Sequence, residues 1–224
     1  MGEPRILGQI GELWAIEKPS GWVVHATHSE ETHDLRAWIR KNGLPKGAAP
    51  LHRLDRGTSG VVLFSADRTL RAELGACFAA GEIKKRYRAL AIGKTRKKGI
   101  IRRNLVERGT SYPAITRWRS TERLGGFTLL TVRPETGRKH QIRQHLLGIG
   151  HPIVGDDRYR PRRFVPVPAF PRRLWLHAAQ ITLPDGTVFT SPLPPELNDH
   201  LQVLRSSSHA STPEPPETPD AERR

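Results

Sequence analysis

The spacing of hydrophobic residues divides most of the chain into short strands and helices. Continuous or alternating apolar runs predict strands, and apolar residues three and four positions apart predict helices. The predicted strands cover residues 12–16, 22–24, 61–64, 83–92, 127–132 and 174–183. The predicted helices cover residues 32–42 and 68–80, with a turn followed by a third helix within 135–149.

Turn and capping residues support these boundaries. Asp67 stands where it can cap the helix at 68–80, and Gly81 stands where that helix ends. Turns at 19–21 and 184–186 predict that the strands on either side of each are joined directly. Cys77 lies in the apolar stripe of the helix at 68–80, so we expect a small core residue rather than a nucleophile.

The C-terminal end has a different composition. Residues 206–224 are rich in Ser, Pro, Glu and Thr and contain almost no apolar side chains. Such a segment buries too little apolar surface to offset the entropy of ordering it. We therefore expect a single domain over residues 1–204 and a disordered tail over residues 205–224.

The charge balance indicates the kind of partner. The 224 residues carry 37 Lys and Arg against 22 Asp and Glu, a formal charge of +15, which favours a polyanionic partner. The sequence contains no apolar run of membrane-spanning length and no signal-like start, so we expect a cytoplasmic protein without a membrane partner. The single cysteine excludes an intramolecular disulfide and a structural zinc cluster built on several cysteines.

Two segments concentrate this charge. Residues 84–103 hold ten Lys and Arg and no acid, and residues 158–173 hold six Arg, also without an acid. A charged run is usually a solvated surface. Runs of one sign at this density indicate contact with the phosphates of a nucleic acid.

The candidate chemistry centres on Asp55, which stands between Arg53 and Arg56 and before a Gly-Thr-Ser-Gly turn. Flanking positive charge favours the carboxylate form, which suits a nucleophile better than a proton donor. An ordinary surface turn with a solvated acid is the alternative. A serine hydrolase using Ser59 is a poor fit, because the Gly-x-Ser-x-Gly spacing is absent.

Three stretches resemble signatures of the RluA family of RNA pseudouridine synthases: His52–Gly60, Lys85–Tyr87 and Gly137–Arg143. Lys18–Gly21 and His151–Asp156 are similar to two shorter family elements. The resemblance implies that Asp55 is the catalytic acid, that Arg143 pairs with it, and that Tyr87 belongs to the active site. We expect the substrate to be bound by Arg53, His52, Arg138 and Lys85, with Arg53 filling the place of a flipped-out uridine.

The resemblance also implies an α+β fold, with a long, mixed, mainly antiparallel sheet flanked by helices and an RNA cleft across its middle. The implied reaction isomerises a uridine of ribosomal or transfer RNA without a cofactor or a metal, and we expect a monomer that needs no protein partner. The chain starts almost directly on its first strand, which predicts that the RNA-binding module preceding the catalytic domain in many relatives is missing. The Lys18 region is somewhat similar to the transfer-RNA-acting TruC type. A non-catalytic, basic RNA-binding protein on the same scaffold is the alternative, as is a basic ribosome-associated structural protein.

Overall fold

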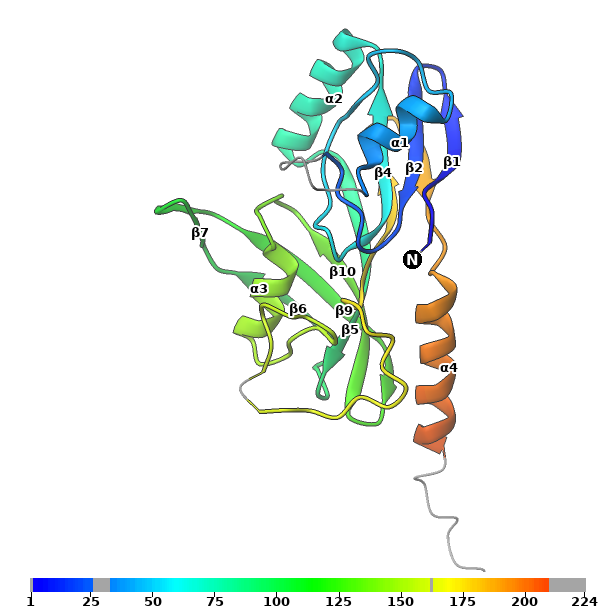
Figure 1. The fold of residues 1–224 in the computed structure, drawn as a ribbon. Coiled ribbons are helices and arrows are strands. Elements are labelled where there is room, and N and C mark those ends of the chain that lie inside the picture. The colour runs from blue at the N-terminus through cyan, green and yellow to red at the C-terminus, as the bar shows by residue number, and fades with distance from the viewer. Residues whose placement is uncertain (1, 26–32, 162, 210–224) are drawn as a thin grey trace, which may run out of the picture.

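The computed structural model describes residues 2–25, 33–161 and 163–209 of the chain. Figure 1 shows a large curved sheet with helices on both sides of it. The helices are α1 (Leu35–Lys41), α2 (Arg68–Ala80), α3 (Gln141–Gly148) and α4 (Pro195–His209). The strands are β1 (Arg5–Ile10), β2 (Leu13–Lys18), β3 (Ala49–Pro50), β4 (Ser59–Ser65), β5 (Lys84–Ile92), β6 (Lys98–Arg102), β7 (Leu105–Glu107), β8 (Thr110–Tyr112), β9 (Ile115–Leu124), β10 (Phe127–Pro134), β11 (Leu176–Thr182) and β12 (Val188–Thr190).

The main sheet has ten strands, in the order β1-β2-β4-β11-β5-β10-β9-β6, with β3 and β12 paired to β4 and β11. Among the described strands, the pairing of β4 with β11 is parallel and the other pairings are antiparallel. The strands β7 and β8 form a separate hairpin that projects from the body (Figure 1). The predicted α+β class with a mixed, mainly antiparallel sheet is confirmed.

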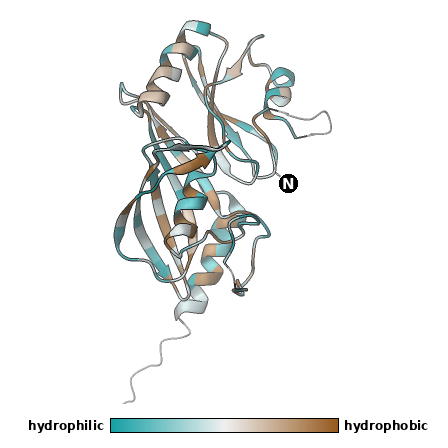
Figure 2. Cartoon of the chain, turned by 90° about the vertical axis from the view of Figure 1, so that its left-hand side faces the viewer, coloured by the Kyte–Doolittle hydropathy of each residue, from teal (hydrophilic) through white to brown (hydrophobic). Residues whose placement is uncertain are grey.

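Alternating side chains of β4 fill two cores in one half of the sheet. Val61 and Leu63 pack with Leu74 of α2, and Val62 and Phe64 pack with helix α1. All four β4 side chains are fully buried, as expected for a strand that is covered on both faces. Figure 2 shows the corresponding alternation of hydrophobic and hydrophilic residues along the strands and helices.

The other half of the sheet lies between α3 and α4, which are on opposite sides of it in Figure 1. Ile142 and Leu146 of α3, and Leu197, Leu201 and Leu204 of α4, belong to the same buried cluster as the strands β5, β9 and β10. The two halves of the sheet meet where β11 pairs with both β4 and β5. The β11 strand therefore joins the half that carries Asp55 to the half that carries α3.

The predicted capping of α2 is confirmed. The Asp67 side chain accepts hydrogen bonds from the backbone amides of Thr69 and Leu70 at 2.7 and 3.2 Å. Gly81 ends the helix with a φ of 76°, a left-handed conformation that glycine adopts without steric cost. Cys77 packs against the core cluster under α2, as predicted.

Other predictions were wrong or incomplete. Residues 22–24 do not form a strand, because the chain turns back at Gly21 toward the Asp55 loop and Val23 makes only an isolated bridge to Asp34. The strands β1, β3, β6, β7, β8 and β9 were not predicted, and β9 carries many charged residues. Residues 205–209 were assigned to a disordered tail, yet they complete α4. The rest of that predicted tail lies outside the described residues.

Candidate active site

A cavity of about 1290 Å³ lies between the two halves of the sheet, beneath the β7–β8 hairpin. All seven predicted site residues line it, although they come from distant parts of the sequence. They are His52, Arg53 and Asp55 from the loop before β4, Lys85 and Tyr87 from β5, Arg138 from the turn before α3, and Arg143 from α3. The structure therefore brings the three sequence motifs together in one cleft, which we call the Asp55 cleft.

The loop that carries Asp55 is held from both of its ends. The Asp55 carbonyl accepts a hydrogen bond from the Thr58 amide at 3.0 Å. His52 Nε2 accepts a hydrogen bond from the Leu63 amide at 3.1 Å, which fastens the start of the loop to β4. Burial, and next the charge of Lys85, lower the pKa of His52 to about 3, so the ring stays neutral and can accept. His52 therefore helps to fix the shape of the loop.

Lys18 also holds this loop, a role that was not predicted. Its side chain is completely buried, and Nζ donates to the carbonyl oxygens of Pro19, Trp22 and Arg56 at 2.9, 2.7 and 3.2 Å. These bonds join the turn after β2 to the Asp55 loop. Burial, followed by the charge of Arg173, lowers the pKa of Lys18 to about 7, although Asp55 acts to raise it.

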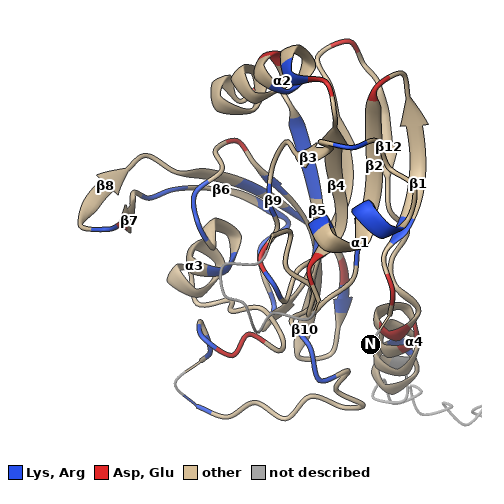
Figure 3. Cartoon of the chain, turned by 45° about the horizontal axis from the view of Figure 1, so that its top comes forward, with Lys and Arg blue, Asp and Glu red and all other residues tan. Residues whose placement is uncertain are grey.

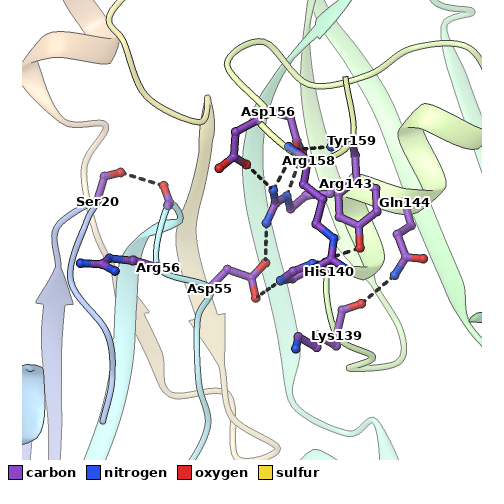
Figure 4. Close-up of polar contacts among 12 residues, drawn as sticks. Ser20, Asp55, Arg56, Lys139, His140, Arg143, Gln144, Asp156, Arg158 and Tyr159 are labelled. Atoms are coloured by element: carbon purple, nitrogen blue, oxygen red, sulfur yellow. Dashed lines mark hydrogen bonds and ion pairs between the residues drawn. The ribbon is translucent and has the colours of Figure 1, made fainter. Parts of the chain in front are cut away.

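The Asp55 carboxylate faces α3 rather than the arginines that flank it in the sequence. Oδ1 lies 3.6 Å from His140 Nε2, and Oδ2 lies 3.7 Å from Arg143 Nη1. Arg56 points away, and its Nε donates to the Gly21 carbonyl at 3.1 Å (Figure 4). The expectation that Arg56 flanks the carboxylate in space is therefore wrong, because adjacent residues of a turn point in different directions.

Arg143 is near Asp55, as the resemblance implied, but it is bound to a different carboxylate. Its Nε and Nη2 donate to Asp156 Oδ2 and Oδ1 at 2.8 and 2.7 Å, and Nη2 also contacts Asp157 Oδ1 at 3.1 Å. Burial acts to raise the pKa of Asp156, but hydrogen bonds from Arg143 and the backbone amides of Tyr159 and Arg158 outweigh it and lower that pKa. Asp156 stays ionised and holds the guanidinium rigidly.

His140 is a site residue that sequence reasoning missed. It precedes α3 with a φ of 55°, which is rare for a residue with a side chain and places its ring beside Asp55. His140 Nδ1 lies 3.1 Å from the Tyr159 hydroxyl, so the ring is held from its other side (Figure 4). Burial lowers the pKa of His140 although Asp55 raises it, which leaves Arg143 as the fixed positive charge.

Tyr87 lies at the centre of the sheet, where β5 pairs with β10 on one side and β11 on the other. It packs against two of the core clusters and lines the Asp55 cleft. Burial, and then the negative charge of Asp55, raise the pKa of Tyr87. Its ring is therefore a neutral phenol at physiological pH.

Lys85 and Arg138 lie at the mouth of the cleft. Lys85 Nζ donates to the Thr136 carbonyl at 3.3 Å, and burial lowers the pKa of this lysine. The Arg138 guanidinium stacks over the Tyr112 ring at 4.8 Å and so links the β7–β8 hairpin to the motif before α3.

Only part of the second basic segment, residues 158–173, lines the Asp55 cleft. Arg158 and Tyr159 line the Asp55 cleft. Arg173 is largely buried instead, where it donates to Ser59 Oγ and to Glu196 Oε1, both at 2.6 Å. Ser59 Oγ is also 2.9 Å from His177 Nδ1. Arg162 lies outside the described residues.

Two further properties concern the described part of the chain. None of its helices is long and apolar enough to cross a membrane. Within the same residues, no three His, Cys, Asp or Glu side chains are grouped so that they could hold a metal ion.

Comparison with known proteins gives a consistent result. The sequence profile of the family described as RNA pseudouridylate synthase matches residues 12–147. The ribosomal large subunit pseudouridine synthase D of Nitrosomonas europaea is 32% identical over 94% of this chain and 68% of its own length. The tRNA pseudouridine synthase C of Salmonella typhimurium is 31% identical over 80% of this chain and 79% of its own length.

The fold is similar to that of the human RNA pseudouridylate synthase domain containing 4 protein, with a TM-score of 0.76 and 24% identity. The similarity covers 89% of this chain and 92% of that one. The Asp55 cleft, the family profile and these relatives agree, and the chain belongs to the RluA group of the RNA pseudouridylate synthase family.

Proposed function

We propose that this protein converts a uridine of ribosomal or transfer RNA to pseudouridine, with Asp55 acting on the ribose of that nucleotide. The observation that carries the proposal is the position of Asp55, which faces a fixed guanidinium at 3.7 Å inside a cleft rimmed with basic side chains. The two relatives described above are named for ribosomal and transfer RNA respectively, and their identities to this chain are nearly equal. Both RNA classes are therefore candidate substrates.

The chemistry needs only one carboxylate. The bond between N1 of the base and the anomeric carbon breaks, the base turns, and a bond from C5 to the same carbon forms. The C5 proton is lost and N1 gains one, so no water is consumed. Glycosidases use two carboxyl groups in order to activate water, whereas here the detached base is itself the next nucleophile.

Asp55 acts either by attacking the anomeric carbon or by removing a proton from the neighbouring carbon. Both routes require the carboxylate, and Arg143 Nη1 places a positive charge 3.7 Å from it. Arg143 also restricts the carboxylate to one orientation, because its own position is fixed by Asp156. His140 limits the other side of the carboxylate at 3.6 Å.

The other cleft residues bind and place the nucleotide. A stacked uridine is out of reach, so the base must be flipped into the cleft. Arg53, which is exposed on the rim, would stack in the vacated position, since a guanidinium plane packs well on bases. Tyr87 would pack against the flipped base and donate a phenolic hydrogen bond, because its raised pKa keeps the hydroxyl protonated.

All of these groups come from a single chain, so we propose that the monomer is active without a protein partner. Ribosomal and transfer RNA as substrates imply that it works in the cytoplasm. A non-catalytic RNA-binding role is disfavoured, because binding of a polyanion does not need a carboxylate placed at the centre of the cleft.

The test is site-resolved mapping of pseudouridine in ribosomal and transfer RNA from cells that lack the gene. We expect wild-type protein to restore a pseudouridine and Asp55→Asn to restore none, while the RNA affinity of Asp55→Asn stays within about 3-fold of wild type. Restoration by Asp55→Asn would remove Asp55 from its role. No restored site in either RNA class with wild-type protein would overturn the proposed substrates.

A further inference from the structure

A second, smaller cavity of about 300 Å³ lies on the face of the sheet opposite to α3, which we call the reverse face. Successive residues of a strand point to opposite faces. On β10, Val132 lies across from Tyr87, which lines the Asp55 cleft, so the next residue, Arg133, points to the reverse side. The lining of this reverse-face pocket includes Lys84, Arg86, Arg117, Arg133, Gln180 and Thr182, together with Gly81, Ile83, Lys85, Pro134 and Glu135.

Strand register places these cations side by side. Arg133 of β10 lies directly across from Arg117 of β9, and Arg86 of β5 lies across from Gln180 of β11. Lys84, Arg86, Arg117 and Arg133 are all exposed. Figure 3 shows Lys and Arg along β5, β6 and β9.

This arrangement costs stability in the free protein. Like charges directly opposite each other on neighbouring strands repel. Within the described residues, Glu135 is the one carboxylate that lines the pocket, and it pairs with Arg117. A surface selected only for solubility would mix both signs. A bound anion would remove the repulsion, and guanidinium groups are well suited to phosphate oxygens.

The reverse-face pocket and the Asp55 cleft meet at a common rim. Gly81, Lys85, Pro134 and Glu135 line both cavities. A strand of RNA that leaves the cleft over this rim reaches the arginines of the reverse face. A free anion such as inorganic phosphate would not need this continuity.

We propose that the reverse-face pocket binds the phosphodiester backbone of the same RNA whose uridine lies in the Asp55 cleft. The inference rests on the proposed function, since it takes the RNA substrate from there. The guanidinium groups of Arg86, Arg117 and Arg133 contact phosphate oxygens, and Gln180 and Thr182 supply neutral hydrogen bonds. The pocket thus extends the footprint of the enzyme beyond the flipped nucleotide and its neighbours.

The test compares the triple variant Arg86→Gln/Arg117→Gln/Arg133→Gln with a variant of equal charge loss elsewhere, Arg36→Gln/Arg40→Gln/Lys46→Gln. All six positions are exposed. Each variant is made in the Asp55→Asn background, and its affinity for unmodified transfer RNA transcripts and for large-subunit ribosomal RNA fragments is measured over a range of salt. Loss of three phosphate contacts makes the slope of log affinity against log salt shallower by about 2. A third variant, Arg86→Lys/Arg117→Lys/Arg133→Lys, keeps the charge and should retain most of the slope.

In the binding experiment, we expect the shallower slope only in the reverse-face variant. When the same three substitutions are made in the protein that retains Asp55, we expect a KM at least about 10-fold higher and an unchanged kcat. Equal slopes in the two triple variants, or a wild-type slope in the first, would overturn the proposal. Thermal unfolding of each variant excludes a misfolded protein. The binding experiment does not depend on turnover, so its failure is separate from a failure to detect pseudouridine.

Discussion

Arg143 binds Asp156 through two hydrogen bonds, from Nε to Oδ2 at 2.8 Å and from Nη2 to Oδ1 at 2.7 Å, and the remaining Nη1 faces Asp55. The side chain of Asp156 is almost completely buried. This second carboxylate fixes the orientation of the Arg143 guanidinium, and therefore the position of the positive charge beside Asp55. Asp156 is a positioning residue, since it lies behind Arg143 and not in the cleft.

Replacing Asp156 by Asn should lower kcat by about 10-fold to 100-fold and change KM by less than about 3-fold. The amide cannot accept two charge-assisted hydrogen bonds, and a small displacement of a catalytic group is costly. Asp157→Asn is the matched control, because Asp157 is 93% exposed and makes a single contact with Arg143 at 3.1 Å. Equal losses in both variants, measured by steady-state kinetics on the mapped RNA, would contradict the positioning role.

Because the His52 ring is buried in its neutral form, we expect the folded protein to lose stability in acid. Its pKa is lowered by burial to about 3 in the folded protein, against about 6.5 in the unfolded chain. Between these values the unfolded state binds the additional proton, so the free energy of unfolding falls as the pH falls from about 6.5 toward 3. We expect His52→Gln, which can still accept the Leu63 amide, to flatten this dependence in urea unfolding experiments. An identical pH profile in the two proteins would show that His52 does not contribute.

Gly60→Ala should destabilise the fold by at least about 3 kcal/mol. Gly60 has a φ of 122°, and an added Cβ would lie 2.2 Å from the Ala178 carbonyl oxygen on β11. The control is Gly75→Ala in α2, where a Cβ meets nothing within 4 Å. That change should stabilise the protein by about 0.5–1 kcal/mol, because alanine favours a helix. Chemical denaturation of both variants measures the difference.

Lys18→Met should weaken both stability and turnover. Methionine fits the buried space but leaves the carbonyls of Pro19 and Trp22 without the Lys18 donor, at a cost of roughly 1–3 kcal/mol for each unsatisfied group. The Arg56 carbonyl loses Lys18 but keeps a hydrogen bond from the Gly21 amide at 2.8 Å. The Asp55 loop loses its anchor, so kcat should fall more than RNA affinity does. Lys41→Met, at an exposed position at the end of α1, serves as the control. Wild-type kcat in Lys18→Met would show that the loop holds its shape without this lysine.

The sequence motifs located the site well, because each is a continuous stretch whose residues stay together. They did not reveal how the side chains are paired. His140 belongs to the Gly137–Arg143 motif, but its role depends on a left-handed backbone conformation. Asp156 belongs to the stretch His151–Asp156, which is similar to a shorter element of the family. Only the packing of that loop against α3 brings Asp156 to Arg143.

The longest strand that was missed, β9, has a clear physical cause. In β9, arginine and glutamate alternate with buried residues such as Thr116 and Trp118, and the exposed charges obscured the period of two. The strand β4, which is buried along its whole length, and the strand β10, which is mostly buried, were evident from their apolar runs. The leucines Leu197, Leu201 and Leu204 have helical spacing and follow prolines, which are signals for α4 that were not used.

Because β11 is central in the sheet but late in the sequence, the sheet can be completed only late in synthesis. A ribosome must complete residues 176–182 before β4 and β5 acquire their shared neighbour. Until then both strands present unpaired edges, which are prone to bind other chains, and the pairing joins residues far apart in sequence, which slows folding. A nascent or truncated chain that stops before β11 therefore contains every motif of the active site, yet the two sides of the cleft come together only when that late strand is inserted between them.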